Sequence, residues 1–462
     1  MRMWLLGLFF VFIACTSDKT KKKTEEPPVL VQEDVQNVYP LLASRQGCAL
    51  DPNLHYSVYY PAGFDSLKQV PVLLLFDPHG DAELPLRKYS TLADRYGVIL
   101  LASADSKNGN GPEQTAAILQ AMIYQSRVIT KADTNRLFTA GFSGGARVAA
   151  MAALSPSGIR GLIVCGAGIP AGSWTGVPPH AVIALGGDRD MNLSEVRDFR
   201  TSNQGLMSRY QLIRYQGLHE WPPVNRFEQA LLALLCVAQR DGLSKKDPAF
   251  LQQARETLVR SSSEMTNVLD KAEALKNILK CLQGMSDVDD IETEIRHLSA
   301  SAPYRQGYTK EQLLIREENQ KREYYIKALG TQDTTWWNRE MKSWRDTLRF
   351  QNEPDRLAMI ARVCGAVSLS TYMSLGRAVS ALHTEQGDYF SAIYRLVDPA
   401  NTEAWYLSAV VAAQEGRMGA SLSYLDEAIR LGFRDGERCR REAAFASFRQ
   451  DNKFQNLINK IP

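Results

Sequence analysis

The feature that most constrains this chain is a serine set between glycines, Gly141-Phe142-Ser143-Gly144-Gly145. Residues 136–140 before it are short and apolar enough for a buried strand, and residues 146–154 after it are rich in helix formers. A chain that passes from strand to helix this quickly needs small residues two positions either side of Ser143, so that the two elements can approach. The start of the helix offers free backbone N–H groups and a positive dipole end. Ser143 is therefore a candidate nucleophile, and Gly144 is a candidate donor to a developing oxyanion.

Apolar runs alternate with helical stretches on both sides of this turn. Residues 70–76 are continuously apolar, as expected of a strand covered on both faces in a parallel sheet. The other predicted strands are 54–60, 98–102, 161–165, 181–185 and 210–215. The predicted helices are 86–96, 113–129, 146–154, 193–202 and 227–240. This alternation predicts an α/β domain over residues 41–242, with a doubly wound, mainly parallel sheet and helices on both faces.

A nucleophilic serine needs a histidine as its general base, and the chain offers few histidines after Ser143. His219 lies in a loop directly after the last predicted strand, where open α/β sheets meet their ligands. His180 comes before a predicted strand, at the wrong end of it, and His297 and His383 lie in the helical C-terminal half. Although a solvent-facing loop histidine is the plainer interpretation, the order of the sheet favours His219 as the base.

The acid that orients the histidine is expected in the loop after the preceding strand, residues 184–192, which offers two carboxylates. The spacing Gly187-x-x-Asp190 favours Asp190. Asp188 stays open as the alternative acid, or as a turn residue paired with Arg189, because spacing alone does not determine the loop geometry.

Residues 50–240 resemble the esterase branch of the α/β-hydrolase fold, near the dienelactone hydrolases, feruloyl esterases and secreted polyhydroxybutyrate depolymerases. The residues that carry the resemblance are His79-Gly80, Gly141-Phe142-Ser143-Gly144-Gly145, Gly187-x-x-Asp190 and His219-x-Trp221-Pro222. The resemblance implies hydrolysis of a small-molecule or polymer-derived ester by a Ser143–His219–Asp190 triad, without a metal or cofactor. It implies an oxyanion site at His79-Gly80-Asp81 and Gly144, with the backbone N–H after Gly80 as the second donor.

Two departures from the family pattern leave the substrate open. No clear long lid is found between the sixth and seventh strands, and residues 77–81 lack the glycine or cysteine cluster often found after His-Gly. Residues 106–111 follow a strand at the expected active-site edge and either line the site or form a turn. Trp174 and Trp221 either flank the entrance or pack in the interior.

The first residues predict export. An arginine precedes an apolar run, residues 4–14, which is too short to span a bilayer and stops at Cys15. This pattern is typical of a bacterial lipoprotein signal over residues 1–15, with Cys15 lipidated, although Phe12 stands where leucine is usual. An ordinary cleaved signal peptide and a membrane-anchored one are the alternatives. The polar, lysine-rich residues 16–40 then form a flexible tether. We expect a lipid-anchored protein of the cell envelope, on the periplasmic face of the outer membrane, with no further membrane-spanning segment.

Composition excludes several other classes of function. The six cysteines after Cys15 are widely spaced, with neither a Cys-x-x-Cys pair nor a compact disulfide framework. Cys165 falls in a predicted buried strand and is expected to pack as a small apolar residue. No metal-ligand cluster is evident. The formal net charge is only +3, part of it in the tether, so nucleic acid is not an expected partner.

Beyond residue 248 strand patterns vanish, and helical periodicity predicts an all-α domain over residues 249–462, with helices at 249–283, 292–298, 310–329 and 336–350. The tryptophans of residues 336–344 have helical spacing and are expected to pack in a core. A tetratricopeptide-like pattern of large and small residues comprises Trp405, Ala409, Ala412, Gly416, Ser421, Leu425 and Ala428, with a weaker copy at 387–399. The helices from 249 onward are expected to form one right-handed solenoid, which either docks a protein partner or packs against the hydrolase.

Two classes of function, and a third possibility, follow from these observations. The favoured one is a lipoprotein serine esterase with an appended helical repeat module. The alternatives are an envelope scaffold with a vestigial hydrolase domain, and a serine peptidase of the prolyl oligopeptidase type. The peptidase usually carries a propeller or specificity subdomain before the hydrolase, and here only about 30 residues precede the sheet.

Overall fold

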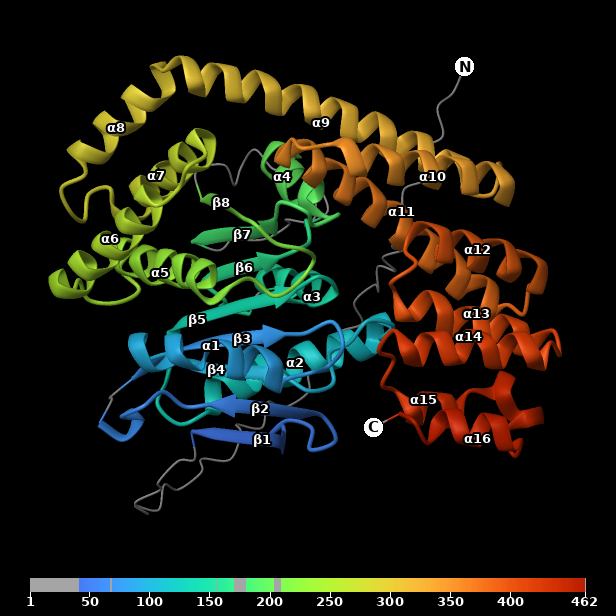
Figure 1. The fold of residues 1–462 in the computed structure, drawn as a ribbon. Helices are drawn as coiled ribbons and strands as arrows, with labels where there is room; N and C mark the ends of the chain where they lie inside the picture. Colours follow the sequence, from blue (N-terminus) through green and yellow to red (C-terminus); the bar gives the residue numbers. More distant parts are fainter. Residues whose placement is uncertain (1–40, 67–68, 156, 170–179, 203–208, 462) are drawn as a thin grey trace, which may run out of the picture. The chain divides into compact units, whose positions relative to one another are not determined.

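The computed structural model describes residues 41–66, 69–155, 157–169, 180–202 and 209–461, and residues from Tyr39 onward form one unit. Its centre is an eight-stranded sheet with the order β1-β2-β4-β3-β5-β6-β7-β8 (Figure 1). The strands are β1 (Leu42–Gly47), β2 (His55–Tyr59), β3 (Val70–Phe76), β4 (Ile99–Ser103), β5 (Ala132–Phe142), β6 (Gly161–Cys165), β7 (Ala181–Gly187) and β8 (Tyr210–Tyr215). β2 pairs antiparallel with β1 and β4, and every pairing from β4 through β3 and β5 to β8 is parallel. This is the α/β-hydrolase fold.

Helices cover both faces of the sheet, as the alternation of elements predicts. On one face, α1 (Glu83–Tyr96) and α5 (Val224–Arg240) pack on apolar side chains such as Leu73 and Ile183. On the other face, α2 (Pro112–Val128), α3 (Gly144–Leu154) and α4 (Leu193–Ser202) pack on the alternate side chains, such as Leu74 and Val182. Because both faces are covered, the central strands are buried at every position, and their sequences read as continuous apolar runs.

Strand β1 was not predicted from the sequence. Four of its six residues are exposed, and its pairing with β2 contains a bulge beside Arg45, whose φ is 47°. An exposed edge strand has no buried face to impose an alternating pattern, so the sequence carries little signal for it. A short 3-10 helix, Phe64–Ser66, follows β2.

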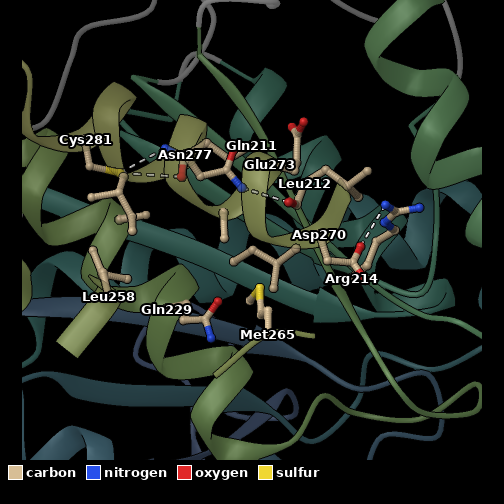
Figure 2. Close-up of a pocket in the computed structure, with 14 residues that line it drawn as sticks. Gln211, Leu212, Arg214, Gln229, Leu258, Met265, Asp270, Glu273, Asn277 and Cys281 are labelled. Atoms are coloured by element: carbon tan, nitrogen blue, oxygen red, sulfur yellow. Dashed lines mark hydrogen bonds and ion pairs between the residues drawn. The ribbon is translucent and has the colours of Figure 1, made fainter. Parts of the chain in front are cut away.

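The opposite edge of the sheet, β8, is covered by a helix of the C-terminal half. The predicted helix at 249–283 is two helices, α6 (Pro248–Ser263) and α7 (Val268–Leu282). From α7, Asn277 Nδ2 donates to the Leu212 carbonyl at 2.8 Å, and the Arg214 guanidinium of β8 pairs with Asp270 of α7 at 2.7 Å (Figure 2). The cavity between these elements is only about 30 Å³. It is a packing void about the size of a water molecule, and α7 occupies the free edge of β8.

The helices beyond residue 249 do not share one core, which differs from the single solenoid expected. Helices α6, α7 and α8 (Asp289–Ala300) contribute to the core on the α1/α5 face of the sheet. A second core is formed by α9 (Ala302–Ala328), α10 (Thr334–Phe350), α11 (Pro354–Ser380) and α12 (Thr384–Val397). Trp337 is fully buried in it, which confirms the prediction that a tryptophan of this segment packs internally. The first helices therefore share a hydrophobic core with the sheet and not with the later helices.

A third core lies in the last helices, α13 (Thr402–Gln414), α14 (Met418–Arg430), α15 (Gly436–Arg441) and α16 (Asn452–Ile458), with a 3-10 segment at Ala443–Phe448 (Figure 1). Helices α13 and α14 form a hairpin that turns at Gly416, whose φ is 71°. Ser421 Oγ of α14 donates to the Ala409 carbonyl of α13 at 2.8 Å. Small side chains at this contact allow the two helices to approach closely.

Among the described residues one helix, α11, is long and apolar enough to span a bilayer by length and composition, with half of its apolar window buried. This helix was not singled out from the sequence, and the expectation of no further membrane-spanning segment stays a prediction. The packing of α11 against α9, α12 and α13 accounts for the apolar sequence, because a helix with neighbours on several sides needs an apolar surface on each of them.

The six cysteines of the described chain are free thiols, and all but Cys364 are fully buried. Burial raises the pKa of the Cys48 thiol to about 11 and that of Cys165 well above its ordinary value. These side chains are therefore protonated at neutral pH and pack as small apolar groups.

Candidate active site

The turn around Ser143 has the strained geometry that its sequence predicts. Ser143 has φ 52° and ψ −119°, a conformation that side chains rarely adopt, and helix α3 begins at the next residue. A Cβ on Gly141 would lie 2.2 Å from the Gly145 carbonyl oxygen, and one on Gly145 would lie 2.0 Å from the Phe76 carbonyl oxygen. Both positions must therefore be glycine, because strand β5, strand β3 and helix α3 meet here backbone to backbone.

The structure brings Ser143, His219 and Asp190 together from three loops at the carboxyl ends of β5, β8 and β7. His219 Nε2 lies 2.9 Å from Ser143 Oγ, and His219 Nδ1 lies 2.9 Å from Asp190 Oδ1. Asp190 is fully buried, and the His219 side chain is 22% exposed. With its proton on Nδ1 donated to Asp190, the imidazole presents an unprotonated Nε2 to the serine hydroxyl. This arrangement can remove the serine proton as the hydroxyl attacks an electrophile.

Two further residues that the sequence analysis missed shape the surroundings of Asp190. The backbone N–H of Asn192 donates to Asp190 Oδ1 at 2.8 Å, and Asn192 Nδ2 donates to the Gly166 carbonyl at 2.9 Å. Gly166 has φ 61°, and a Cβ there would lie 2.8 Å from Asp190 Oδ2 and 3.1 Å from His219 Nδ1. A glycine directly after a buried strand was the available signal, because such a position often marks close approach of another group.

Asp188, the alternative acid, is placed differently from Asp190. Its side chain is 40% exposed, and its Oδ1 accepts a hydrogen bond from the backbone N–H of Gly217 at 3.0 Å. Its own backbone N–H donates to the Tyr215 carbonyl at 2.7 Å. Asp188 thus ties the acid loop to the loop that carries His219.

The loop after β3, where the sequence places His79, Gly80 and Asp81, lies beside the serine turn. Gly80 has φ 76°, and its own N–H donates to the Asp77 carbonyl at 3.3 Å. In the described part of the chain the backbone N–H of Asp81 has no hydrogen-bond partner, while Asp81 Oδ1 accepts from the Leu84 N–H at 3.1 Å. The N–H groups of Asp81 and of Gly144, at the first position of α3, therefore stay the candidate oxyanion donors.

A buried carboxylate that was not singled out in the sequence, Asp77, connects this loop to the histidine loop. Asp77 is 2% exposed; its Oδ1 accepts from the His79 backbone N–H and its Oδ2 from Trp221 Nε1, both at 2.8 Å. Burial opposes ionisation of Asp77, but these hydrogen bonds together with the His79 side chain outweigh it and lower its pKa. The hydrogen bond with Asp77 in turn raises the pKa of His79. Trp221 itself is buried, so it packs and does not flank an entrance, whereas Trp174 lies outside the described residues.

The segment 106–111 lies beside the same site. The backbone N–H of Asn108 donates to the Pro78 carbonyl at 2.7 Å, and Lys107 forms an isolated antiparallel bridge with His79. Asn108 Oδ1 lies 1.9 Å from the place that a Cβ on Gly144 would occupy. An exposed amide therefore stands next to the candidate oxyanion donor, which makes Asn108 a candidate substrate contact. Within the described ranges no group of three or more His, Cys, Asp or Glu side chains is placed to hold a metal ion.

Comparison with solved structures finds esterases and related hydrolases. Esterase 2 of Thermogutta terrifontis, in a form phosphonylated by sarin, is 12% identical, with a TM-score of 0.34 and coverage of 45% of this chain and 96% of that one. A protein described as a dienelactone hydrolase, from Klebsiella pneumoniae, is 14% identical (TM-score 0.31; 40% and 88% covered). A ferulic acid esterase from the anaerobic fungus Anaeromyces mucronatus is 17% identical (TM-score 0.33; 42% and 89% covered).

Neither a scan against protein-family models nor a search of curated proteins gives a match. At identities and TM-scores this low, the fold follows from the strand order and the chemistry follows from the geometry of the site.

Proposed function

We propose that this protein is a serine hydrolase that cleaves carboxylic esters. The observation that carries the proposal is the continuous hydrogen-bonded series from Ser143 Oγ through His219 to the buried Asp190, with a distance of 2.9 Å at each step. In the reaction Ser143 Oγ attacks the acyl carbonyl while His219 Nε2 takes the serine proton. Asp190 stabilises the imidazolium, and the N–H groups of Gly144 and Asp81 bind the oxyanion.

The second half of the reaction uses the same groups. His219 passes its proton to the leaving alkoxide oxygen, and the alcohol departs and leaves an acyl group on Ser143. Water then attacks the acyl carbonyl while His219 takes one of its protons. As the bond from the acyl carbon to Ser143 Oγ breaks, His219 returns that proton to Oγ, and the acid departs. The strained turn supports this role, because it holds the serine hydroxyl beyond the end of strand β5 at the N-terminus of α3.

We further propose that the protein is exported and anchored through lipidated Cys15, on the periplasmic face of the outer membrane. The support is the sequence pattern of the first 15 residues, which lie outside the described residues. The tetratricopeptide-like assignment of the last helices is supported by the α13–α14 hairpin and its buried small residues. We propose that this hairpin contributes to a surface for a protein partner.

The test is turnover of p-nitrophenyl esters of increasing acyl length by the full chain in detergent, beside Ser143→Ala. We expect the wild type to turn over and to be labelled on Ser143 by a fluorophosphonate, and the variant to lose both. The acyl length that is hydrolysed fastest then indicates the size of the acyl pocket. Hydrolysis of a proline-containing peptide anilide in place of the esters would instead support the peptidase alternative.

Absence of both turnover and labelling in the wild type would refute the proposal that the protein is a serine hydrolase. The scaffold alternative would then be tested by cross-linking partners to the helical half in the envelope.

A further inference from the structure

Two arginines of the C-terminal helices bind the loop that carries Asp190. Arg322 of α9 donates through Nη1 to the Met191 carbonyl at 2.9 Å and to Ser194 Oγ at 2.7 Å. Arg362 of α11 donates through Nη1 to the carbonyl of Asp188. The two guanidinium groups thus bind backbone carbonyls on either side of Asp190. Arg362 binds the carbonyl two residues before it, and Arg322 binds the carbonyl directly after it.

A buried carboxylate, Glu318 of α9, holds these arginines in place. Glu318 is 1% exposed; Arg362 Nε lies 3.0 Å from each of its oxygens, and Arg362 Nη2 lies 2.6 Å from Oε2. Arg322 lies 3.7 Å away, and Arg197, on helix α4 directly after the acid loop, lies 3.5 Å away. A buried charge is stable only when it is well paired, so the cluster determines the positions of α9, α11 and α4 together.

The rest of the acid loop is held mainly from the side of the histidine loop. The N–H groups of Asp188 and Arg189 donate to carbonyls at 215 and 217, at 2.7 and 3.0 Å. On the helical side α11 approaches so closely that a Cβ on Gly365 would lie 3.0 Å from the Met191 Cβ. The acid loop therefore lies between two surfaces, one from the hydrolase domain and one from the helical half.

We infer that Arg322 and Arg362, held by Glu318, are positioning residues for Asp190, so that the helical half completes the hydrolase site. This inference rests on the proposed function. Neither arginine touches the reacting atoms. Both act through the acid loop, whose displacement would lengthen the 2.9 Å contact between Asp190 and His219. An error of about 1 Å in such a contact can lower the rate about 100-fold.

The experiment compares Arg322→Met and Arg362→Lys with a matched control, Arg356→Met. Arg322 is 22% exposed, so its loss leaves the fold largely intact. Lysine at 362 keeps a charge opposite Glu318 but lacks the fork that reaches the Asp188 carbonyl. The control removes an ion pair between the same two helices, Arg356 to Glu317 at 2.9 Å, which does not contact the acid loop.

Two measurements are made on each variant. Turnover, as kcat and KM, is normalised to the fraction of sites titrated by fluorophosphonate, so that misfolded protein does not count. The downfield proton resonance of His219 Nδ1–H, assigned by its loss in Asp190→Asn, reports the histidine–aspartate contact without requiring turnover.

We expect Arg322→Met and Arg362→Lys each to lower kcat about 10-fold or more, with KM changed less than about threefold. The downfield resonance should shift or broaden, Arg356→Met should match the wild type, and Arg322→Lys should restore part of the loss. Wild-type kcat and an unchanged resonance in both variants would overturn the inference.

A wild type with neither turnover nor fluorophosphonate labelling would refute the proposed function, but it would not by itself refute the positioning role of the two arginines. In that case the resonance still decides whether these arginines position the acid: a shift in both variants supports the inference, and an unchanged signal overturns it. If either Arg322→Met or Arg362→Lys folds poorly, the other variant, together with Arg322→Lys, decides the inference.

Discussion

Replacing the two carboxylates of the acid loop separates their roles. Asp190 is fully buried, and its Oδ1 accepts from both His219 Nδ1 and the Asn192 N–H, at 2.9 and 2.8 Å. In Asp190→Asn the side chain carries no negative charge to stabilise the imidazolium. Its NH2 group can also donate to His219 Nδ1, which places the imidazole proton on Nε2 and leaves no acceptor for the serine proton. The loss known for this change in a serine triad is about 10⁴-fold in kcat, equivalent to about 5.5 kcal/mol.

Asp188→Ala removes a different and weaker interaction. The carboxylate is 40% exposed and accepts one hydrogen bond, from the Gly217 N–H at 3.0 Å. One such bond contributes about 1 kcal/mol, so even if all of it were lost in the transition state the rate would fall about fivefold. The two variants should therefore differ by about three orders of magnitude.

The assay is ester turnover per site titrated with a fluorophosphonate, with far-UV circular dichroism to monitor folding. Because Asp190→Asn slows the titration itself, its active sites are counted after prolonged labelling. If Asp188→Ala lost as much activity as Asp190→Asn, or if Asp190→Asn kept more than about a tenth of wild-type turnover, the assignment of Asp190 as the acid would fail.

Two further predictions concern stability. Gly145→Ala should lower the free energy of unfolding by about 1–3 kcal/mol or more, because its Cβ meets the Phe76 carbonyl. Gly144→Ala should cost less, because its Cβ meets only the exposed side-chain amide of Asn108. Urea denaturation compares the two variants, and equal losses would contradict the close approach at Gly145. Asp77 has a folded-state pKa below its ordinary 3.8, so its stabilising contribution is present above that value and is lost as pH falls through the folded pKa. Asp77→Asn should therefore flatten the fall of Tm below about pH 4, and an unchanged slope would refute this account.

The serine turn and the sheet could be predicted from the sequence because their requirements are local. Gly141 and Gly145 are needed wherever a strand, a sharp turn and a helix meet at a serine, and the structure has backbone oxygens 2.2 and 2.0 Å from where their Cβ atoms would lie. The apolar run of β3 reflects burial on both faces, and the alternation of elements reflects the doubly wound sheet. Strand β1 carried no such requirement, since most of its residues are exposed.

Spacing favoured Asp190 over Asp188 as the group nearest to His219, but it could not exclude Asp188. Both carboxylates follow the same strand, and which of them meets His219 depends on how the loop turns against Gly166 and the histidine loop. Gly166 and Asn192 were missed for the same reason. Each makes a contact with a residue more than 20 positions away in sequence, and the only local sign was the glycine that directly follows strand β6.

The sequence by itself determined the serine turn, the layered α/β architecture and the helical character of the C-terminal half, because these depend on periodicity and on the size of neighbouring side chains. Only the tertiary structure decided how the helical half is used. Helix α7 covers the free edge of β8, and Arg322 and Arg362 reach the backbone beside Asp190. A guanidinium on a helix has the same sequence signature whether it faces water or a distant loop, and only the packing of that helix determines which carbonyl it meets.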